Sequence, residues 1–135
     1  MKELERELDE LLIAYYLGDK LRDLKFMDVV MDGLIEAFLL RFPTHRVDAV
    51  YSHTPATSPL RRLFVHAFVF SGEANWIIKH KEKYPREFLY DLSMAFITEK
   101  PKGAILCTDA PYKKNSCDYH QHKGTDKACY KTKRV

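Results

Sequence analysis

The sequence lacks the features that mark several large classes of protein. Its 135 residues include only three cysteines, an odd number that does not make the even disulfide framework of a small secreted fold. It has no run of about 18 apolar residues that would span a bilayer, and Met1 to Glu10 is acidic, unlike the basic start of a signal peptide. We therefore expect a soluble, intracellular protein of the cytoplasm or nucleus, without a membrane partner.

The net charge is small, but the charged residues are unevenly distributed. The net charge of +3 is too small to indicate a dedicated nucleic-acid-binding protein. Residues 1–100 carry 14 basic and 16 acidic side chains, whereas residues 101–135 carry 8 and 3 and have few large apolar groups. Burial of so little apolar surface cannot offset the entropy lost on ordering this segment. We predict a folded domain over residues 1–100 and a disordered basic tail over residues 101–135.

Helical periodicity is the main structural signal before residue 100. Apolar residues recur at i, i+3, i+4 and i+7, so the fold class is all-α, an irregular bundle of five or six helices. The most buried of these should begin at Ser58-Pro59 and end at Ser71-Gly72, with a strand as the alternative over Leu63 to Phe70. The other expected helices are an N-terminal one that breaks near Asp23, a second from Phe26 to the stop at Phe42-Pro43, a turn or two at Val47–Tyr51, a short one at Glu73–His80, and a last one after Tyr84-Pro85 with Phe88, Leu89, Leu92, Ala95 and Phe96 inward.

Several polar and aromatic residues of these helices have ordinary structural interpretations. We expect His66 to be hydrogen-bonded at the edge of the core and Trp76 to anchor the core. Arg61 with Arg62, and Glu87 with Asp91, are interpreted as charges on helix surfaces.

The order of motifs resembles a known family. Leu11–Leu21 followed by Phe26–Ile35 is similar to the closing helices of a BTB/POZ domain. The motifs Thr54-Pro55, Ser58–Leu63, Gly72–Trp76 and Tyr84–Leu92 then follow as in the extension found after this domain in fungal BTB/POZ proteins. The resemblance covers residues 8–97, and the family's mixed α/β core would precede residue 8, where nothing corresponds to it. The family's dimerisation and cullin-ligase adaptor contacts depend on that core.

The resemblance implies a non-catalytic protein–protein interaction module that binds a protein partner or a second copy of itself. Its candidate contact residues, where a BTB core would normally pack, are Leu12, Tyr15, Tyr16 and Phe38. No nucleophile motif such as Gly-x-Ser-x-Gly is present, so we expect neither an enzyme nor a small-molecule substrate, and no cofactor.

The alternative function lies in the tail. Cys117, His120, His122 and Cys129 offer two thiols and two imidazoles within 13 residues, which is the ligand set of tetrahedral zinc. An extended His-x-His places both rings on one side, and a metal would supply order that the tail lacks. Against zinc, the spacing matches no common finger, and a flexible basic tail explains the same residues.

The basic residues of the tail suggest a second use for it. Interleaved lysines and tyrosines are typical of a low-specificity nucleic-acid contact, although such tails are usually only solvated. Cys107 is interpreted as a reduced thiol. The residues concerned are Lys113, Lys114, Lys123, Lys127, Lys131, Lys133 and Arg134, with Tyr112, Tyr119 and Tyr130 among them.

Overall fold

The computed structural model describes residues 2–99, 111–122 and 128–133. Within these ranges it contains seven α-helices, several 3-10 turns and no strand, which confirms the all-α prediction. None of the helices in the described ranges has the length and apolar character needed to cross a membrane. The chain divides into two compact units, Met1–Phe42 with Asn115–Val135, and Pro43–Lys114. This division differs from the single helical domain predicted for residues 1–100.

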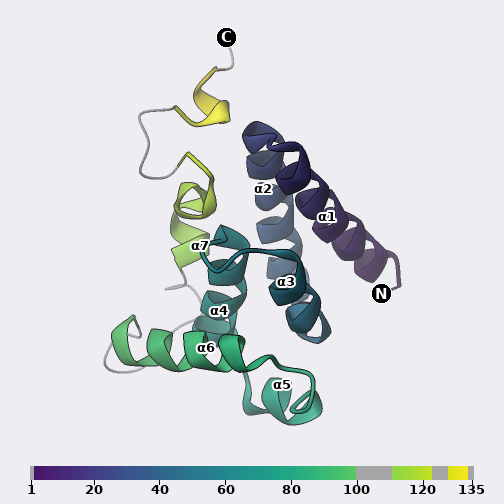
Figure 1. Ribbon diagram of the computed structural model, residues 1–135, viewed down its shortest axis with the longest axis vertical. Coiled ribbons are helices and arrows are strands. Elements are labelled where there is room, and N and C mark those ends of the chain that lie inside the picture. The colour runs from purple at the N-terminus through teal and green to yellow at the C-terminus, as the bar shows by residue number, and fades with distance from the viewer. Residues whose placement is uncertain (1, 100–110, 123–127, 134–135) are drawn as a thin grey trace. The chain divides into compact units, whose positions relative to one another are not determined.

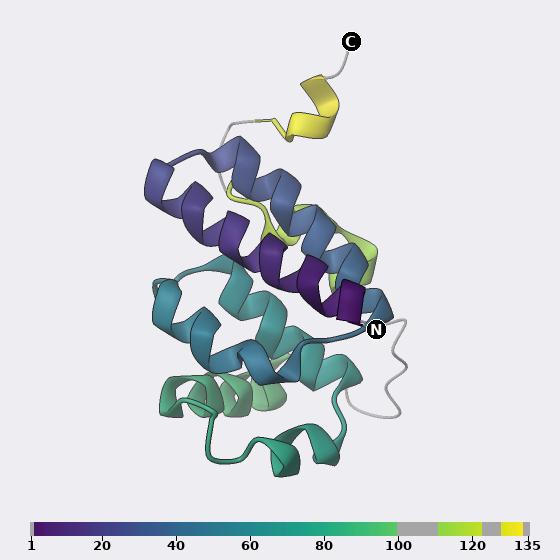
Figure 2. The same ribbon diagram turned by 90° about the vertical axis from the view of Figure 1, so that its right-hand side faces the viewer.

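The first unit is built on a helical hairpin of α1 (Lys2–Leu21) and α2 (Leu24–Leu40), which lie side by side in Figures 1 and 2. Arg22 adopts a left-handed conformation with φ 57°. The N–H groups of Arg22 and Asp23 donate to the carbonyls of Asp19 and Gly18, which satisfies the last turn of α1. The Asp23 carboxylate then accepts from Phe26 N at 3.1 Å and caps α2, so the break falls where the sequence predicts it.

Apolar side chains hold the two helices of the hairpin together. Gly18 allows a close approach, because a Cβ at this position would lie 2.8 Å from Met27 Cγ. Near the other end of the hairpin, Glu5 and Arg41 form an ion pair of 2.8 Å. The buried side chains of the two helices include Leu8, Leu12, Tyr15, Met27, Val30, Met31, Leu34, Ile35 and Phe38.

The second unit is built around α4 (Pro59–Ser71), which is buried at eleven of its thirteen positions. Ser58 Oγ accepts from Leu60 N at 3.2 Å, so the predicted serine cap is confirmed and the strand alternative over Leu63–Phe70 is wrong. Around α4 are packed α3 (Val47–His53), which follows a 3-10 turn at Thr44–Arg46, α6 (Arg86–Thr98) and α7 (Pro111–Lys114), and α5 (Ala74–Lys79) joins α4 to α6.

Aromatic rings make the centre of this unit. Phe68 lies at its middle, with ring centroids 5.1 Å from Trp76, 5.7 Å from Tyr84 and 5.0 Å from Phe88. The Tyr84 hydroxyl donates to the Trp76 carbonyl at 2.6 Å and thereby holds the mostly exposed α5 against the core. Trp76 therefore contacts the core at its edge.

Two expectations for this unit are corrected by the structure. Leu89 and Phe96 were expected inward, but they are 40% and 41% exposed, and only Phe88, Leu92 and Ala95 of α6 are buried. Arg61 was expected on the surface, but it is buried and hydrogen-bonded. His66 meets its prediction, since its buried ring bonds the Glu99 carboxylate at 3.0 Å.

The structure describes parts of the segment for which we predicted disorder. Short helical turns form at η3 (Ser116–Tyr119) and η4 (Tyr130–Lys133), and both contact α2. Residues 100–110, 123–127 and 134–135 lie outside the described residues, so the prediction of disorder is untested for them. These ranges include Cys107, Lys123, Lys127 and Arg134.

Candidate metal centre

The turn η3 places the first ligand of the predicted metal set. The side chain of Asn115 accepts from Cys117 N at 3.1 Å and begins the turn, and His120 N donates to the Cys117 carbonyl at 3.1 Å to end it. The backbone is extended at His120, with ψ 155°. Gln121 and His122 follow in a turn, so the predicted extended His-x-His segment is not formed, although the two rings lie close together with centroids 5.1 Å apart.

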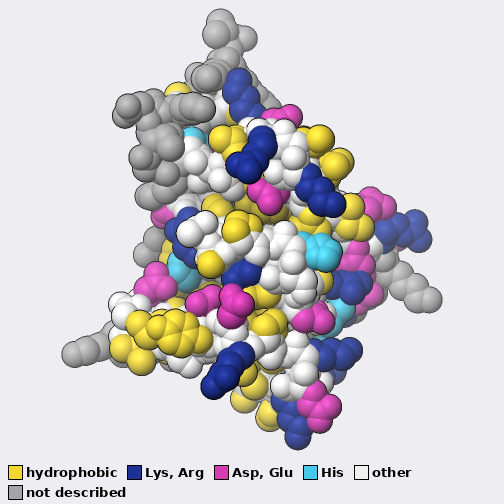
Figure 3. Space-filling model, viewed as in Figure 1, with side chains coloured by type: hydrophobic (Ala, Val, Ile, Leu, Met, Phe, Trp, Pro, Cys, Tyr) yellow, Lys and Arg dark blue, Asp and Glu magenta, His cyan; other side chains and the backbone are white. Residues whose placement is uncertain are grey.

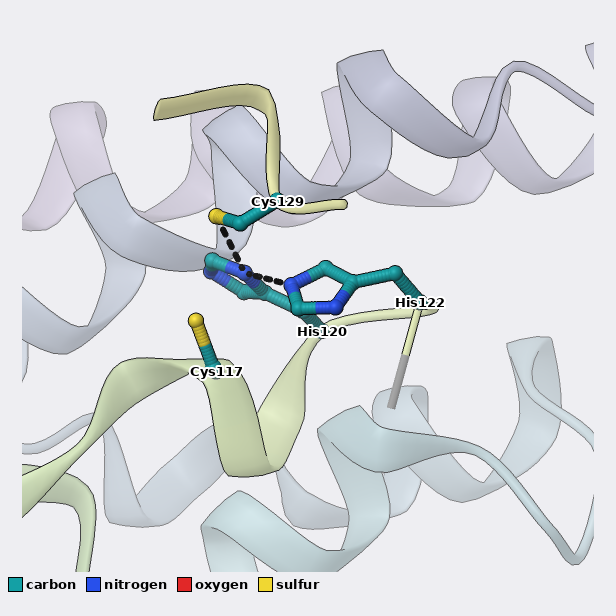
Figure 4. A group of neighbouring side chains, drawn as sticks. All are labelled: Cys117, His120, His122 and Cys129. Carbon is teal, nitrogen blue, oxygen red and sulfur yellow. Dashed lines mark hydrogen bonds between the residues drawn. The ribbon is translucent and has the colours of Figure 1, made fainter. Parts of the chain in front are cut away.

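The four predicted ligands lie together in the first unit. Cys117, His120, His122 and Cys129 each offer one donor atom, and these four atoms all lie within 4.8 Å of one another. His120 Nδ1 is 3.0 Å from His122 Nε2 and 3.6 Å from Cys129 Sγ, and Cys117 and Cys129 are both reduced. Figure 4 shows the Cys117 thiol and the two histidine rings on one segment of the chain and the Cys129 thiol on another, with all four side chains close together.

The cluster is close to the size that a zinc ion requires. Zinc bonds of about 2.0–2.1 Å to nitrogen and 2.3 Å to sulfur give a tetrahedron with edges of about 3.3–3.8 Å. The distances of 3.0 Å and 3.6 Å approximate such edges, and the upper limit of 4.8 Å exceeds the longest of them by about 1 Å. The four donor atoms are therefore close enough together that the cluster could hold a metal ion.

A second layer of residues supports the cluster from α2. Asp32 Oδ1 lies 2.6 Å from His120 Nε2, the ring nitrogen that faces away from the other ligands. Asp28 Oδ1 accepts from the backbone N–H of Gln121 at 2.6 Å, and the Gln121 amide donates to the Tyr15 hydroxyl at 3.1 Å. The Tyr130 hydroxyl donates to Asp32 Oδ2.

Burial and hydrogen bonding determine the electrostatics of this layer. Burial raises the pKa of Asp28, although the bond from Gln121 N opposes it. Burial would also raise the pKa of Asp32, but hydrogen bonds from Tyr130 and His120 outweigh it and hold that pKa below its usual value. The pKa of the Cys117 thiol is raised mainly by burial and to a smaller extent by a hydrogen bond with Cys129. Asp32 is therefore ionised beside the buried His120 ring.

Sequence reasoning missed this second layer. Asp28 and Asp32 stand four residues apart in a largely apolar helix, and at that spacing they share one face. This acidic pair was the available signal, but nothing in the sequence linked Asp32 to His120, 88 residues further on.

The other candidate residues have different environments. Leu12, Tyr15 and Phe38 are buried and Tyr16 is half-buried, and contact of these residues with a partner stays a prediction. Of the tyrosines in the basic segment, Tyr112 and Tyr119 are buried, and neither offers an exposed ring face for base stacking.

No family model, curated protein or solved structure matches this chain. The BTB/POZ resemblance therefore stays a prediction, and function must be argued from the residues of the site.

Proposed function

We propose that this protein binds one structural zinc ion through Cys117, His120, His122 and Cys129. The observation that carries the proposal is the arrangement of His120, whose Nδ1 lies among the other ligand atoms while its Nε2 contacts the Asp32 carboxylate. Histidines that bind zinc usually have this second contact. Two thiolates and two imidazoles in tetrahedral geometry favour zinc over hard cations, which prefer oxygen.

The role proposed for the zinc is structural and not catalytic. Four protein ligands close the coordination shell, whereas catalytic zinc keeps one position for water or substrate. The ligands come from two described segments, 117–122 and Cys129, and the ion would join them. Because the free energy of metal binding adds to that of folding, zinc would hold these segments against α2.

Metal analysis of the purified full chain tests the proposal. We expect one zinc per chain, and with Co²⁺ as a probe we expect the absorption of a tetrahedral site with thiolate charge transfer. Cys117→Ser and His122→Ala should lose this signal. The matched controls are Cys107→Ser, a cysteine outside the proposed ligand set, and His53→Ala, an exposed histidine of α3. A wild-type chain that takes up no zinc, or controls that lose as much as the ligand variants, would overturn the proposal.

A second candidate function is self-association through α6, which retains the interaction role expected from the resemblance. Tyr90, Met94 and Ile97 follow one stripe of this helix and are 66%, 42% and 77% exposed. Figure 3 shows hydrophobic side chains gathered over the C-terminal part of α6. The three stripe residues are uncharged, so two copies of the stripe can face each other about a two-fold axis without charge repulsion.

The oligomeric state of the chain tests this second function. Light scattering over a range of concentrations should detect a dimer, and Ile97→Glu should shift it to monomer. Leu40→Glu places the same charge at an equally exposed site on α2 and should leave the dimer intact. A monomer at all concentrations would refute the second function without affecting the zinc proposal.

A further inference from the structure

Asp32 contacts both segments that supply the metal ligands. Its carboxylate lies 2.6 Å from His120 Nε2, accepts from the Tyr130 hydroxyl, and is 3.3 Å from Lys131 Nζ. A side-chain hydrogen bond with Ser116 completes the set. Ser116 precedes one cysteine ligand and Tyr130 follows the other, so one carboxylate on α2 contacts a neighbour of each thiol and one of the two rings.

The contact with His120 determines which ring nitrogen is available to a metal. A carboxylate only accepts hydrogen bonds when ionised, so the proton of the neutral ring lies on Nε2, facing Asp32. Nδ1 then carries the lone pair, and it is Nδ1 that lies near His122 and Cys129. The side chain of His120 is fully buried, which leaves the ring little freedom to choose another arrangement.

Asp28 supports the same segment one helical turn earlier. It accepts from the backbone N–H of Gln121, the residue between the two histidines, at 2.6 Å. The backbone of the His-x-His segment is therefore fixed by Asp28, while Asp32 fixes one of its rings.

We propose that Asp32 is a positioning residue of the metal centre, which selects Nδ1 of His120 as the ligand atom and transmits zinc binding to the α1–α2 hairpin. This inference rests on the zinc-binding function proposed above. The carboxylate also makes the imidazole a stronger ligand, since partial negative charge at Nε2–H raises electron density at Nδ1. Asp32 does not touch the metal, and its effect passes through His120 and through the residues beside the two cysteines.

Zinc affinity of Asp32 variants tests the proposal. With Zn²⁺ titrated against a competing chelator, Asp32→Ala should bind about 10–100-fold more weakly than wild type, which is the usual effect of losing such a partner. Asp32→Asn retains an acceptor oxygen but loses the charge, so its zinc affinity should lie between those of wild type and Asp32→Ala. Glu36→Gln is the matched control, because Glu36 is exposed on the next turn of α2, and it should stay within about twofold of wild type.

A spectroscopic readout separates positioning from a general structural role. Long-range ¹H–¹⁵N correlations of the zinc-loaded wild type should show His120 bound through Nδ1, with a slowly exchanging proton on Nε2. Asp32→Ala should lose the slow exchange of that proton. Circular dichroism of the metal-free variants shows whether the helices persist, and if Asp32→Ala does not fold, Asp32→Asn supplies the comparison.

The possible outcomes distinguish this inference from the function on which it rests. Absence of zinc binding in wild type would remove both. Zinc binding with equal affinity in wild type, Asp32→Ala and Glu36→Gln, or coordination of His120 through Nε2, would overturn the role of Asp32 and leave the zinc site standing.

Discussion

The guanidinium of Arg61 lies 4.3 Å from the centre of the Tyr51 ring, and its Nη2 donates to the Tyr51 carbonyl at 2.8 Å. Arg61 is 7% exposed, and it also donates from Nη2 to the Thr54 carbonyl, from Nε to the Thr54 hydroxyl, and from Nη1 to Glu87. The Tyr51 hydroxyl in turn donates to Asp91 at 2.7 Å. One arginine of α4 thus satisfies the C-terminal end of α3 and links it to α6.

Replacement of Arg61 by lysine should destabilise the protein by about 2–3 kcal/mol, because a lysine cannot reach all these acceptors and leaves buried carbonyl oxygens without donors. Chemical denaturation followed by circular dichroism measures the loss. The control is Arg62→Lys at the neighbouring exposed position, which should change stability by less than about 0.5 kcal/mol. Equal effects of the two substitutions would mean that the hydrogen bonds of Arg61 contribute little.

The apolar core around α4 makes a second prediction. Leu63 and Phe68 are both buried, so Leu63→Ala or Phe68→Ala should each cost about 2–5 kcal/mol through the cavity that it leaves. Thermal melts compare these variants with Leu40→Ala, which truncates an exposed side chain of α2 outside the proposed contact stripe and should have little effect. No shift of the melting temperature for either core variant would refute the burial of α4.

The sequence predicts the helices well because their signals are local. The Ser58-Pro59 cap, the break near Asp23 and the stop at Phe42-Pro43 each depend on the conformational preferences of one or two residues. The candidate metal ligands were also predictable as a group, since cysteine and histidine at short spacing are informative without knowledge of the fold.

Pairings between distant residues were not predictable from the sequence. The burial of Arg61 depends on carbonyls of Tyr51 and Thr54 that become acceptors only where α3 ends beside α4. The pairing of Asp32 with His120 joins residues 88 positions apart. Tertiary contacts of this kind outweigh the general preference of charged side chains for the surface.

Removal of zinc should loosen a defined part of the chain. Hydrogen–deuterium exchange with and without a chelator should show faster exchange in residues 116–122 and 128–133 of the metal-free protein, and little change in α4. At free zinc about 1,000-fold above the dissociation constant, the ion adds about 4 kcal/mol to the stability of the segments it joins. Identical exchange in the two states would show that zinc has no structural role.

High pH should destabilise the second unit through two buried phenols. Burial raises the pKa of Tyr84 to about 12, and burial together with the hydrogen bond to Asp91 raises the pKa of Tyr51. A folded-state pKa above the unfolded value of about 10 means that the unfolded chain loses its phenolic protons first. The stabilising contribution of Tyr84 is therefore complete below pH 10 and is lost as the pH rises from 10 to about 12.

Denaturation midpoints on either side of pH 10 measure this loss, and tyrosinate absorbance reports the titration directly. Tyr84→Phe keeps the ring that packs on Phe68 and Phe88 but removes the ionisable group. It should be less stable than wild type at neutral pH, because the hydrogen bond to the Trp76 carbonyl is lost, and its stability should fall less steeply above pH 10. The control is Tyr90→Phe at an exposed position, for which stability should fall above pH 10 as steeply as in wild type. Parallel slopes for wild type and Tyr84→Phe would show that ionisation of Tyr84 is not coupled to folding.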